Sequence, residues 1–276
     1  MTGTDSLRGV LTDWLLADKA ALLCGETVGR GANPGEATVG LLDRFGEAQV
    51  VDLPAVDDVI LGFAVGAALA GRPTVVQLVG TSALHAAAPY LTDLARAGTH
   101  AAFVARVPSG PHADDSLLPV LDTGADVFVA GSPDRVAHLW ARALSSGRPT
   151  VIVEPRSVMA AFAAELQVAP TSPAVLLAAF GDGVALATTA ARRLNAEGIP
   201  AEVFVIESLV PLDTDLLGAA LAPVGRLVVV HPNDETVAQR IVLGALSVAF
   251  EFLEAPIALA SSSDEAVRAA HNAFTW

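Results

Sequence analysis

Short, continuously apolar segments alternate with segments of helical periodicity along the whole chain. Examples of the apolar segments are PTVVQLV at 73–79, HAAFVARV at 100–107, ADVFVA at 125–130 and PTVIVEP at 149–155. Strands that are apolar on both sides must be buried on both faces, which is typical of parallel sheets covered by helices. The alternation therefore predicts an α/β fold built from doubly wound parallel sheets.

The alternation is interrupted once, in the middle of the chain. Between residues 156 and 173 the pattern loosens, and PTSP at 170–173 has the composition of a linker. A second alternation starts with AVLLAAF at 174–180 and ends in a helix that runs to Trp276. A chain of 276 residues is long enough for two cores, so we expect one domain over 1–168 and another over 173–276.

Composition and charge exclude several classes of protein. Hydrophobic residues make up 53% of the chain, so part of its apolar surface is expected to face another chain. The net charge is −14 and no basic cluster is present, which argues against nucleic acid or an anionic membrane as a partner. The longest uncharged run, 73–92, contains polar residues and prolines, and the N-terminus lacks a basic leader. We therefore expect no membrane span, no signal peptide and a cytoplasmic location.

Few residues are suited to binding a metal or a dinucleotide. Cys24 is the only cysteine, and the six histidines do not pair at ligand spacing, so we expect no metal site in this chain. The glycines of 29–35 follow a predicted strand, but their spacing differs from the dinucleotide fingerprint and Pro34 interrupts the turn.

The stretch VDLPAVDDVILGFAVGAALAG at 51–71 has two interpretations. An acidic pair, Asp57 and Asp58, precedes an uncharged run in which glycines and alanines leave little side chain on one helical face. The helix is either a core helix whose carboxylates complement its dipole, or a close helix contact between subunits that holds one carboxylate for proton chemistry. His112, in the loop PSGPHADD after a predicted strand, is placed where α/β sheets carry their sites.

Segments from both predicted domains follow one another in the order GETVG, GLLDRFGEAQVVDLP, GFAVGAALAGRPTVVQ, GPH, PTVIVEPR, GIPAEVFVIESLVPLDTDLL, GRLVVVH and FEFLEAPIALASSSD. In this order they resemble the beta subunit of the first component of thiamine diphosphate-dependent 2-oxo acid dehydrogenases, and the resemblance covers nearly the whole chain. The family lies in the transketolase-like superfamily, where the C-terminal subunit of split transketolases is a near relative.

The resemblance implies a split active site. It implies a pyrimidine-binding transketolase-like domain over 1–168 and a transketolase C-terminal-like domain over 173–276. Thiamine diphosphate would be shared with an alpha subunit that holds the diphosphate and Mg²⁺, in an α2β2 assembly. Gly-Asp-Gly at 181–183 resembles the start of the family's magnesium motif, but no Asn pair follows, so it is predicted to be a tight turn.

The resemblance also implies roles for individual residues. Asp57 stands where the family has a glutamate that hydrogen-bonds N1′ of the aminopyrimidine and activates the cofactor. Aspartate is shorter by one methylene, on the order of 1.5 Å. Glu26, in GETVG, matches a glutamate of the family and is expected to support the cofactor or the interface. His112 matches the family's active-site histidine and would orient or protonate the substrate.

Two further departures from the family concern the cofactor stack and the C-terminus. The family's aromatic-rich segment is replaced by VQLVGTSALHAAAPY, and Thr81 falls near the position of the stacking aromatic residue. The stack is therefore either missing or supplied by Leu78, His85 or Tyr90, and Leu78, Thr81 and His85 are our candidates for contact with the cofactor. The sequence after LEAP is shorter than in the family. The sequence therefore leaves open whether an acyltransferase core docks to this chain.

The resemblance predicts a catalytic beta subunit, active with an alpha partner. Its substrate would be a small 2-oxo acid or ketose, which it decarboxylates or from which it transfers two carbons through an enamine intermediate. The missing docking segment favours a bacterial carboligase or decarboxylase of specialised metabolism. The alternative is a non-catalytic structural or regulatory partner of a thiamine diphosphate-binding alpha subunit.

Overall fold

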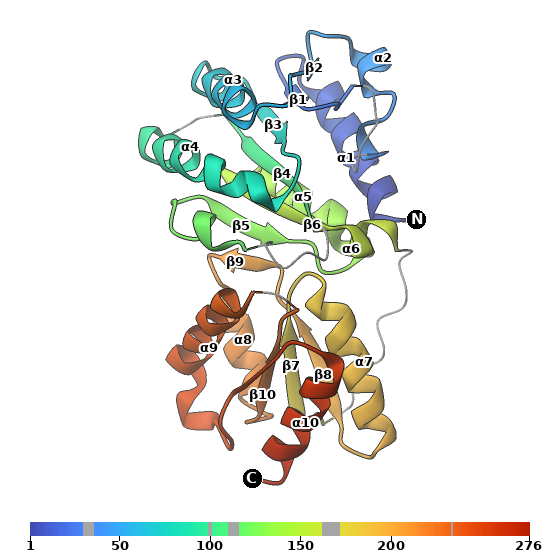
Figure 1. Ribbon diagram of the computed structural model, residues 1–276, viewed down its shortest axis with the longest axis vertical. Coiled ribbons are helices and arrows are strands. Elements are labelled where there is room, and N and C mark those ends of the chain that lie inside the picture. The colour runs from blue at the N-terminus through green and yellow to red at the C-terminus, as the bar shows by residue number, and fades with distance from the viewer. Residues whose placement is uncertain (30–35, 99–100, 110–115, 162–171, 233) are drawn as a thin grey trace. The chain divides into compact units, whose positions relative to one another are not determined.

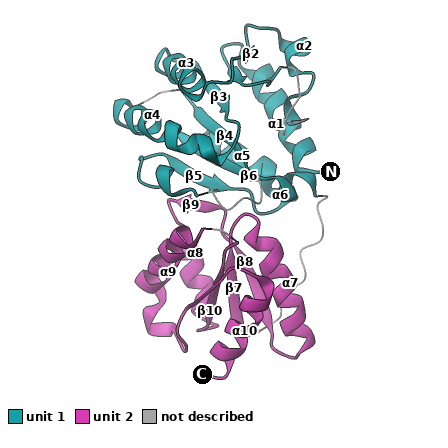
Figure 2. Cartoon of the chain, in the orientation of Figure 1, with its two compact units in different colours: residues 1–163 teal, residues 164–276 magenta. Residues whose placement is uncertain are grey.

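The computed structural model describes residues 1–29, 36–98, 101–109, 116–161, 172–232 and 234–276. The chain divides into two compact units, Met1–Ala163 and Ala164–Trp276 (Figure 2). The predicted linker at 170–173 lies partly outside the described residues. No helix in the described ranges combines the length and the hydropathy that crossing a membrane requires.

Unit 1 is built on a parallel sheet with the strand order β2-β1-β3-β4-β6-β5. Its strands are β1 (Leu22–Gly25), β2 (Val50–Asp52), β3 (Thr74–Gln77), β4 (Phe103–Ser109), β5 (Asp126–Val129) and β6 (Thr150–Pro155). Every residue of β1, β3, β4, β5 and β6 is buried. This burial explains why these strands are continuously apolar in the sequence.

Helices cover both faces of this sheet (Figure 1). They are α1 (Gly3–Ala17), α2 (Leu41–Phe45), α3 (Asp57–Leu69), α4 (Leu84–Ala97), α5 (Val136–Leu144) and α6 (Arg156–Ala160), with 3₁₀ turns η1 (Glu36–Thr38), η2 (Thr81–Ala83), η3 (Leu118–Val120) and η4 (Pro133–Arg135). Helices α1 and α5 pack together on one face, and α3 packs against α4 on the other.

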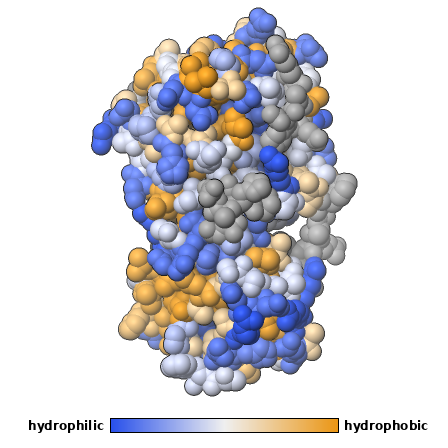
Figure 3. All heavy atoms as spheres, viewed as in Figure 1, coloured by the Kyte–Doolittle hydropathy of each residue, from blue (hydrophilic) through white to orange (hydrophobic). Residues whose placement is uncertain are grey.

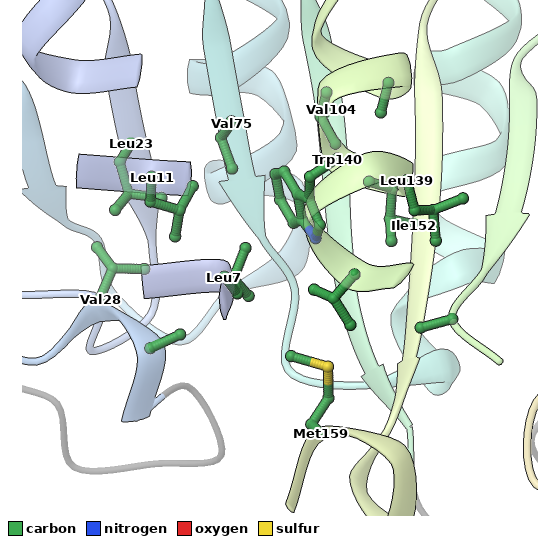
Figure 4. Close-up of a cluster of buried hydrophobic side chains, with 14 of the residues drawn as sticks. Leu7, Leu11, Leu23, Val28, Val75, Val104, Leu139, Trp140, Ile152 and Met159 are labelled. Carbon is green, nitrogen blue, oxygen red and sulfur yellow. The ribbon is translucent and has the colours of Figure 1, made fainter. Parts of the chain in front are cut away.

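A buried apolar cluster joins α1 and α5 to the sheet (Figure 4). Leu7, Leu11 and Leu15 recur at helical spacing on α1 and are fully buried. They belong to the same cluster as Val75 of β3 and Trp140 of α5. The helical periodicity of residues 5–18 in the sequence therefore corresponds to the face of α1 that covers the sheet.

Unit 2 has a four-stranded parallel sheet in the order β11-β10-β7-β8. Its elements are β7 (Val175–Ala179), α7 (Gly183–Ala196), β8 (Ala201–Val205), β9 (Ser208–Val210), α8 (Thr214–Leu221), β10 (Leu227–Val230), α9 (Glu235–Ala249), η5 (Phe250–Phe252), β11 (Ala258–Ala260) and α10 (Ser263–Phe274). Helices α7 and α10 pack together, as do α8 and α9. Leu216, Leu243 and Phe250 are exposed, and Figure 3 shows an apolar area over α8 and α9.

The predicted elements differ from the observed ones mainly at their ends. The sequence pattern of residues 36–45 predicts one helix, but the structure divides this segment into η1 and α2 because Gly40 adopts a left-handed conformation, with φ +79°. The pattern of residues 234–253 likewise predicts one helix, whereas the observed helix α9 ends at Ala249 and is followed by a 3₁₀ turn. Neither α6 nor β9 is predicted by the sequence pattern, because each is too short to have a clear period.

Candidate functional site

Most of the predicted site residues leave the sheet of unit 1 at the same edge. Strands β2, β1, β3 and β4 are neighbours and run parallel, so their carboxyl ends meet at one edge. Glu26 follows β1, Asp57 starts the helix after β2, and Leu78 and Thr81 follow β3. His112 follows β4 in the sequence but lies outside the described residues. The topology therefore brings to one edge residues that are far apart in the sequence.

This edge contains a topological switch point between β1 and β3. The chain passes from β1 to β2 on one side and then returns across β1 to β3. Open α/β sheets bind ligands at such points. Gly25 pairs in register with Gln77, and a Cβ on Gly25 would lie 2.4 Å from the Gln77 carbonyl oxygen. Only glycine permits this close approach of the two strands. Glu26 directly follows Gly25, and Leu78 directly follows Gln77.

The two acids at the start of α3 have different surroundings. Asp57 is the first residue of the helix and is half-buried, whereas Asp58 is exposed. The hydroxyl of Tyr90, on α4, donates to Asp58 Oδ1 at 3.3 Å. Both carboxylates complement the helix dipole. Asp57 is the more enclosed of the two, and Asp58 is the one that is tied to α4.

Tyr90 gives a direct test of this arrangement because it is the only tyrosine of the chain. Desolvation, followed by the charge and the hydrogen bond of Asp58, raises the pKa of Tyr90 above its usual 10.0. We expect a tyrosinate titration midpoint above 10.0 in the wild-type chain, measured by ultraviolet absorbance. Asp58→Asn should lower the midpoint, and Asp57→Asn should lower it less. Equal shifts for the two variants would contradict the observed pairing.

The raised pKa of Tyr90 makes the folding stability decrease at alkaline pH. Because the folded-state pKa of Tyr90 is raised, its contribution is fully present below the unfolded-state value and is lost as the pH rises through the folded-state value. The loss is therefore confined to pH values above about 10.

The candidates for pyrimidine contact after β3 are not equally accessible. Leu78 is 1% exposed and its amide donates to the Arg106 carbonyl at 2.9 Å, which extends the β3–β4 pairing. Thr81 starts η2 and is also buried, whereas His85, on the first turn of α4, is exposed. Val79 is 47% exposed and is the accessible apolar side chain of this segment. No sequence pattern distinguishes Val79 from Leu78, because every residue of β3 before them is buried.

A buried polar network lies across β3, β4 and β6 at the same edge. Arg106 Nε donates to Glu154 Oε2 at 2.8 Å, and a second guanidinium nitrogen donates to the side-chain oxygen of Gln77. Trp140 Nε1 donates to Glu154 Oε1 at 2.9 Å. Arg106 and Glu154 are 2% and 1% exposed. This network is not among the residues predicted from the sequence, although the single charges inside the apolar strands HAAFVARV and PTVIVEP are a signal of it.

Metal ligands do not cluster anywhere in the described ranges of the chain. The sequence Gly-Asp-Gly at 181–183 forms the turn between β7 and α7. A Cβ on Gly183 would lie 2.6 Å from the Val230 carbonyl oxygen, so glycine is needed for the helix to approach β10. The prediction of a tight turn at this motif is therefore confirmed.

Sequence comparisons relate both units to known proteins. The family described as transketolase, C-terminal domain, matches residues 164–274, which is nearly all of unit 2. The mitochondrial pyruvate dehydrogenase E1 component subunit beta-2 of Oryza sativa subsp. japonica is 26% identical over 96% of this chain and 79% of the rice protein. The E1 component subunit beta of Staphylococcus epidermidis is 28% identical over 96% of this chain and 90% of its own length.

Solved structures share the fold at lower identity. A split gene transketolase, described as an inactive beta4 tetramer, has a TM-score of 0.72 and 16% identity and covers 100% of this chain and 98% of its own. A 2-oxoglutarate:ferredoxin oxidoreductase from Magnetococcus marinus has a TM-score of 0.68 and 9% identity over 99% of this chain and 65% of its own. These likenesses confirm the predicted α/β fold class.

Proposed function

Since this chain is related along nearly its whole length to beta subunits of the pyruvate dehydrogenase first component, we propose that it is the beta subunit of a heteromeric thiamine diphosphate-dependent enzyme. Its alpha partner completes the active site. The reaction is decarboxylation of a 2-oxo acid or transfer of a two-carbon unit from a ketol donor. The observation that carries this proposal is the meeting of Glu26, Asp57 and the segment after β3 at one switch-point edge.

The described residues at this edge fit the pyrimidine end of the cofactor. Glu26 and Asp57 are half-buried carboxylates, and a carboxyl group can share a proton with a ring nitrogen. The guanidinium of Arg106 is buried against Glu154 and does not reach out to a diphosphate. We assign Mg²⁺ and the diphosphate to the alpha subunit, as the resemblance to beta subunits implies.

The roles of the residues follow from their chemistry. When bound, thiamine diphosphate supplies an electron sink for the bond that breaks beside the substrate carbonyl. Asp57 would hold the pyrimidine end of the cofactor and exchange a proton with a ring nitrogen, and Glu26 would support Asp57 from the end of β1. His112 orients the substrate oxygen, a role that rests on the sequence resemblance. Val79 offers apolar contact in place of the missing aromatic ring.

The outer face of α3 supports an alpha partner that packs closely on this chain. Val59 and Phe63 are 47% and 42% exposed on this helix. A Cβ built on Gly62 or Gly66 meets no atom within 4 Å, so both glycines face open space. Exposed glycines weaken a helix unless a neighbouring backbone uses the room that they leave. We assign this face to a helix of the alpha subunit.

Substitution of Gly66 is expected to separate assembly from folding. Gly66→Leu should leave the isolated chain folded, with thermal stability equal to or above that of the wild type, since nothing lies where the side chain would extend. The same variant should lose most of the alpha–beta complex in analytical ultracentrifugation. Gly198→Leu is not a suitable control, because Gly198 has φ +83° and would be strained.

Gly9→Leu on α1 is a better control, because a Cβ there also meets no atom within 4 Å and Gly9 lies on a different helix. It should form the complex normally. If the Gly66→Leu variant formed the alpha–beta complex fully, α3 would not be the contact with the alpha subunit.

Thiamine diphosphate binding is the first test of the proposed function. Calorimetry with Mg²⁺ should detect no tight binding to this chain alone, and tight binding once the cognate alpha chain is co-expressed with it. Release of carbon dioxide or ketol transfer by that complex then identifies the substrate. Tight binding by this chain alone would contradict the split site, and no binding in either sample would contradict the proposed function.

Further details of the proposal rest on composition and resemblance. We place the enzyme in a bacterial cytoplasm, as an α2β2 carboligase or decarboxylase. Cys24 is buried, and burial raises the pKa of its thiol to about 12, which keeps it unreactive. The exposed apolar side chains on α8 and α9 provide more surface for an oligomer.

A further inference from the structure

Thr27 has a backbone conformation that is unfavourable for its residue type. Its φ is +53°, and it is the only residue other than glycine with a positive φ in the described part of the chain. A β-branched side chain in the left-handed region is a genuine outlier, because Cβ approaches the backbone too closely. Thr27 therefore stores strain directly after β1, beside Glu26.

The environment of the Thr27 side chain is also unfavourable, for a reason that is independent of the backbone conformation. Its hydroxyl oxygen is shut off from solvent and makes no hydrogen bond to the described residues. A buried hydroxyl without a partner loses its hydration and gains nothing in return. Glycine or asparagine would fit this position with less strain. Unfavourable features of this kind persist where the neighbouring structure holds them in place, and they concentrate at functional sites.

The neighbouring residues hold the strained turn on both sides. Before it, the Gly25 carbonyl accepts from the Leu53 amide at 2.9 Å, and Gly25 packs on the Gln77 backbone. After it, Val28 is fully buried in the core of unit 1. The Gly29 amide donates to Asp52 Oδ1 at 2.6 Å. These anchors fix both ends of the turn, so its middle cannot relax.

We propose that Thr27 is a positioning residue that holds the carboxylate of Glu26 at the cofactor edge, an inference that rests on the proposed function. The anchors tie the turn to β2 and β3, the strands that lead to Asp57 and Leu78. The stiff, branched side chain of Thr27 then removes the remaining freedom of the backbone beside Glu26. Glu26 is thereby kept in one orientation relative to the other site residues.

Two substitutions separate rigidity from strain. Thr27→Asn relieves the backbone strain and keeps a polar side chain that tolerates the left-handed region, whereas Thr27→Gly also frees the backbone. In the isolated chain, Thr27→Asn should raise the melting temperature by about 2–4 °C. Thr27→Gly should speed amide hydrogen exchange at residues 25–29, and Thr27→Asn should not.

In the alpha–beta complex, Thr27→Gly should weaken thiamine diphosphate binding about tenfold, since Glu26 then occupies its working orientation only part of the time. Thr27→Asn should keep much more of the affinity. A purely structural role would instead give equal affinities for the two variants, and that result would overturn the proposal.

Failure of the proposed function is distinguishable from failure of this inference. A wild-type complex that binds no thiamine diphosphate contradicts the proposed function. The melting and hydrogen-exchange measurements on the isolated chain still decide whether Thr27 holds the turn. A lower melting temperature for Thr27→Asn, or unchanged exchange for Thr27→Gly, overturns the positioning role whatever the cofactor result.

Discussion

Asp57→Asn is expected to lower the turnover of the assembled enzyme by about 10²–10⁴-fold, because proton transfer by one positioned side chain contributes about that much. Asparagine has nearly the same shape as aspartate but cannot accept the proton. Since Asp57 is half-buried at the start of α3, the substitution should leave the fold and the complex intact. Steady-state turnover, together with cofactor affinity by calorimetry, measures the effect.

Asp58→Asn is the matched control for this experiment. It removes one charge from the same helix turn, but Asp58 is exposed and paired with Tyr90. It should keep a turnover close to that of the wild type. If Asp57→Asn also kept full turnover, the chain would be a structural partner of the alpha subunit, which is the alternative that the sequence left open.

Asp57→Glu tests the departure from the family at the same position. The added methylene restores the length that relatives of this kind are expected to have at this point. If Asp57 reaches the cofactor through a shift of the backbone, the longer side chain will be too close and turnover will fall. If a water molecule bridges the gap, Asp57→Glu will displace it and keep or raise turnover. Either change in turnover would place the carboxylate at the cofactor. If Asp57→Asn and Asp57→Glu both left the turnover and its pH dependence unchanged, the carboxylate would not be at the cofactor.

The sequence predicts the fold of this chain well because its strands are buried on both sides. Buried strands must be continuously apolar, so β3, β4 and β6 are evident in the sequence as runs bounded by proline and glycine. Elements without such a constraint are missed, such as α6, which is five residues long. The left-handed Gly40 that divides a predicted helix is equally invisible, because glycine is also tolerated within helices.

The candidate site could be predicted only in part. Parallel pairing brings Glu26, Asp57 and Leu78 to one edge, and this follows from the order of the strands. Side-chain accessibility does not follow from that order, so the burial of Leu78 and the exposure of Val79 and His85 are evident only in the structure. The strain at Thr27 could not be foreseen either, since no local pattern assigns a positive φ to threonine.

Removal of Arg106 is expected to cause the largest loss of stability. Arg106→Met leaves the Glu154 carboxylate buried with Trp140 as its remaining donor among the observed hydrogen bonds. Breaking a buried ion pair by removing one partner lowers the free energy of unfolding by about 3–5 kcal/mol. Urea denaturation of the full chain, with near-ultraviolet circular dichroism as the signal for unfolding, measures this loss. Arg148→Met is the surface control, because Arg148 is 52% exposed and pairs with Asp126 at 3.4 Å. Its loss should stay below about 1 kcal/mol.

A double substitution separates the buried charge from the packing around it. In Arg106→Met with Glu154→Gln, no charge remains in the network, and the amide oxygen at 154 can still accept from Trp140 Nε1. Most of the stability lost in Arg106→Met should return, because the buried carboxylate that caused the loss is gone. A double variant as unstable as Arg106→Met would mean that the guanidinium acts through its packing and its bond to Gln77. In that case the ends of β3 and β4 would loosen together, and cofactor affinity would fall in both variants alike. Recovered stability with full affinity would assign the network to the fold alone.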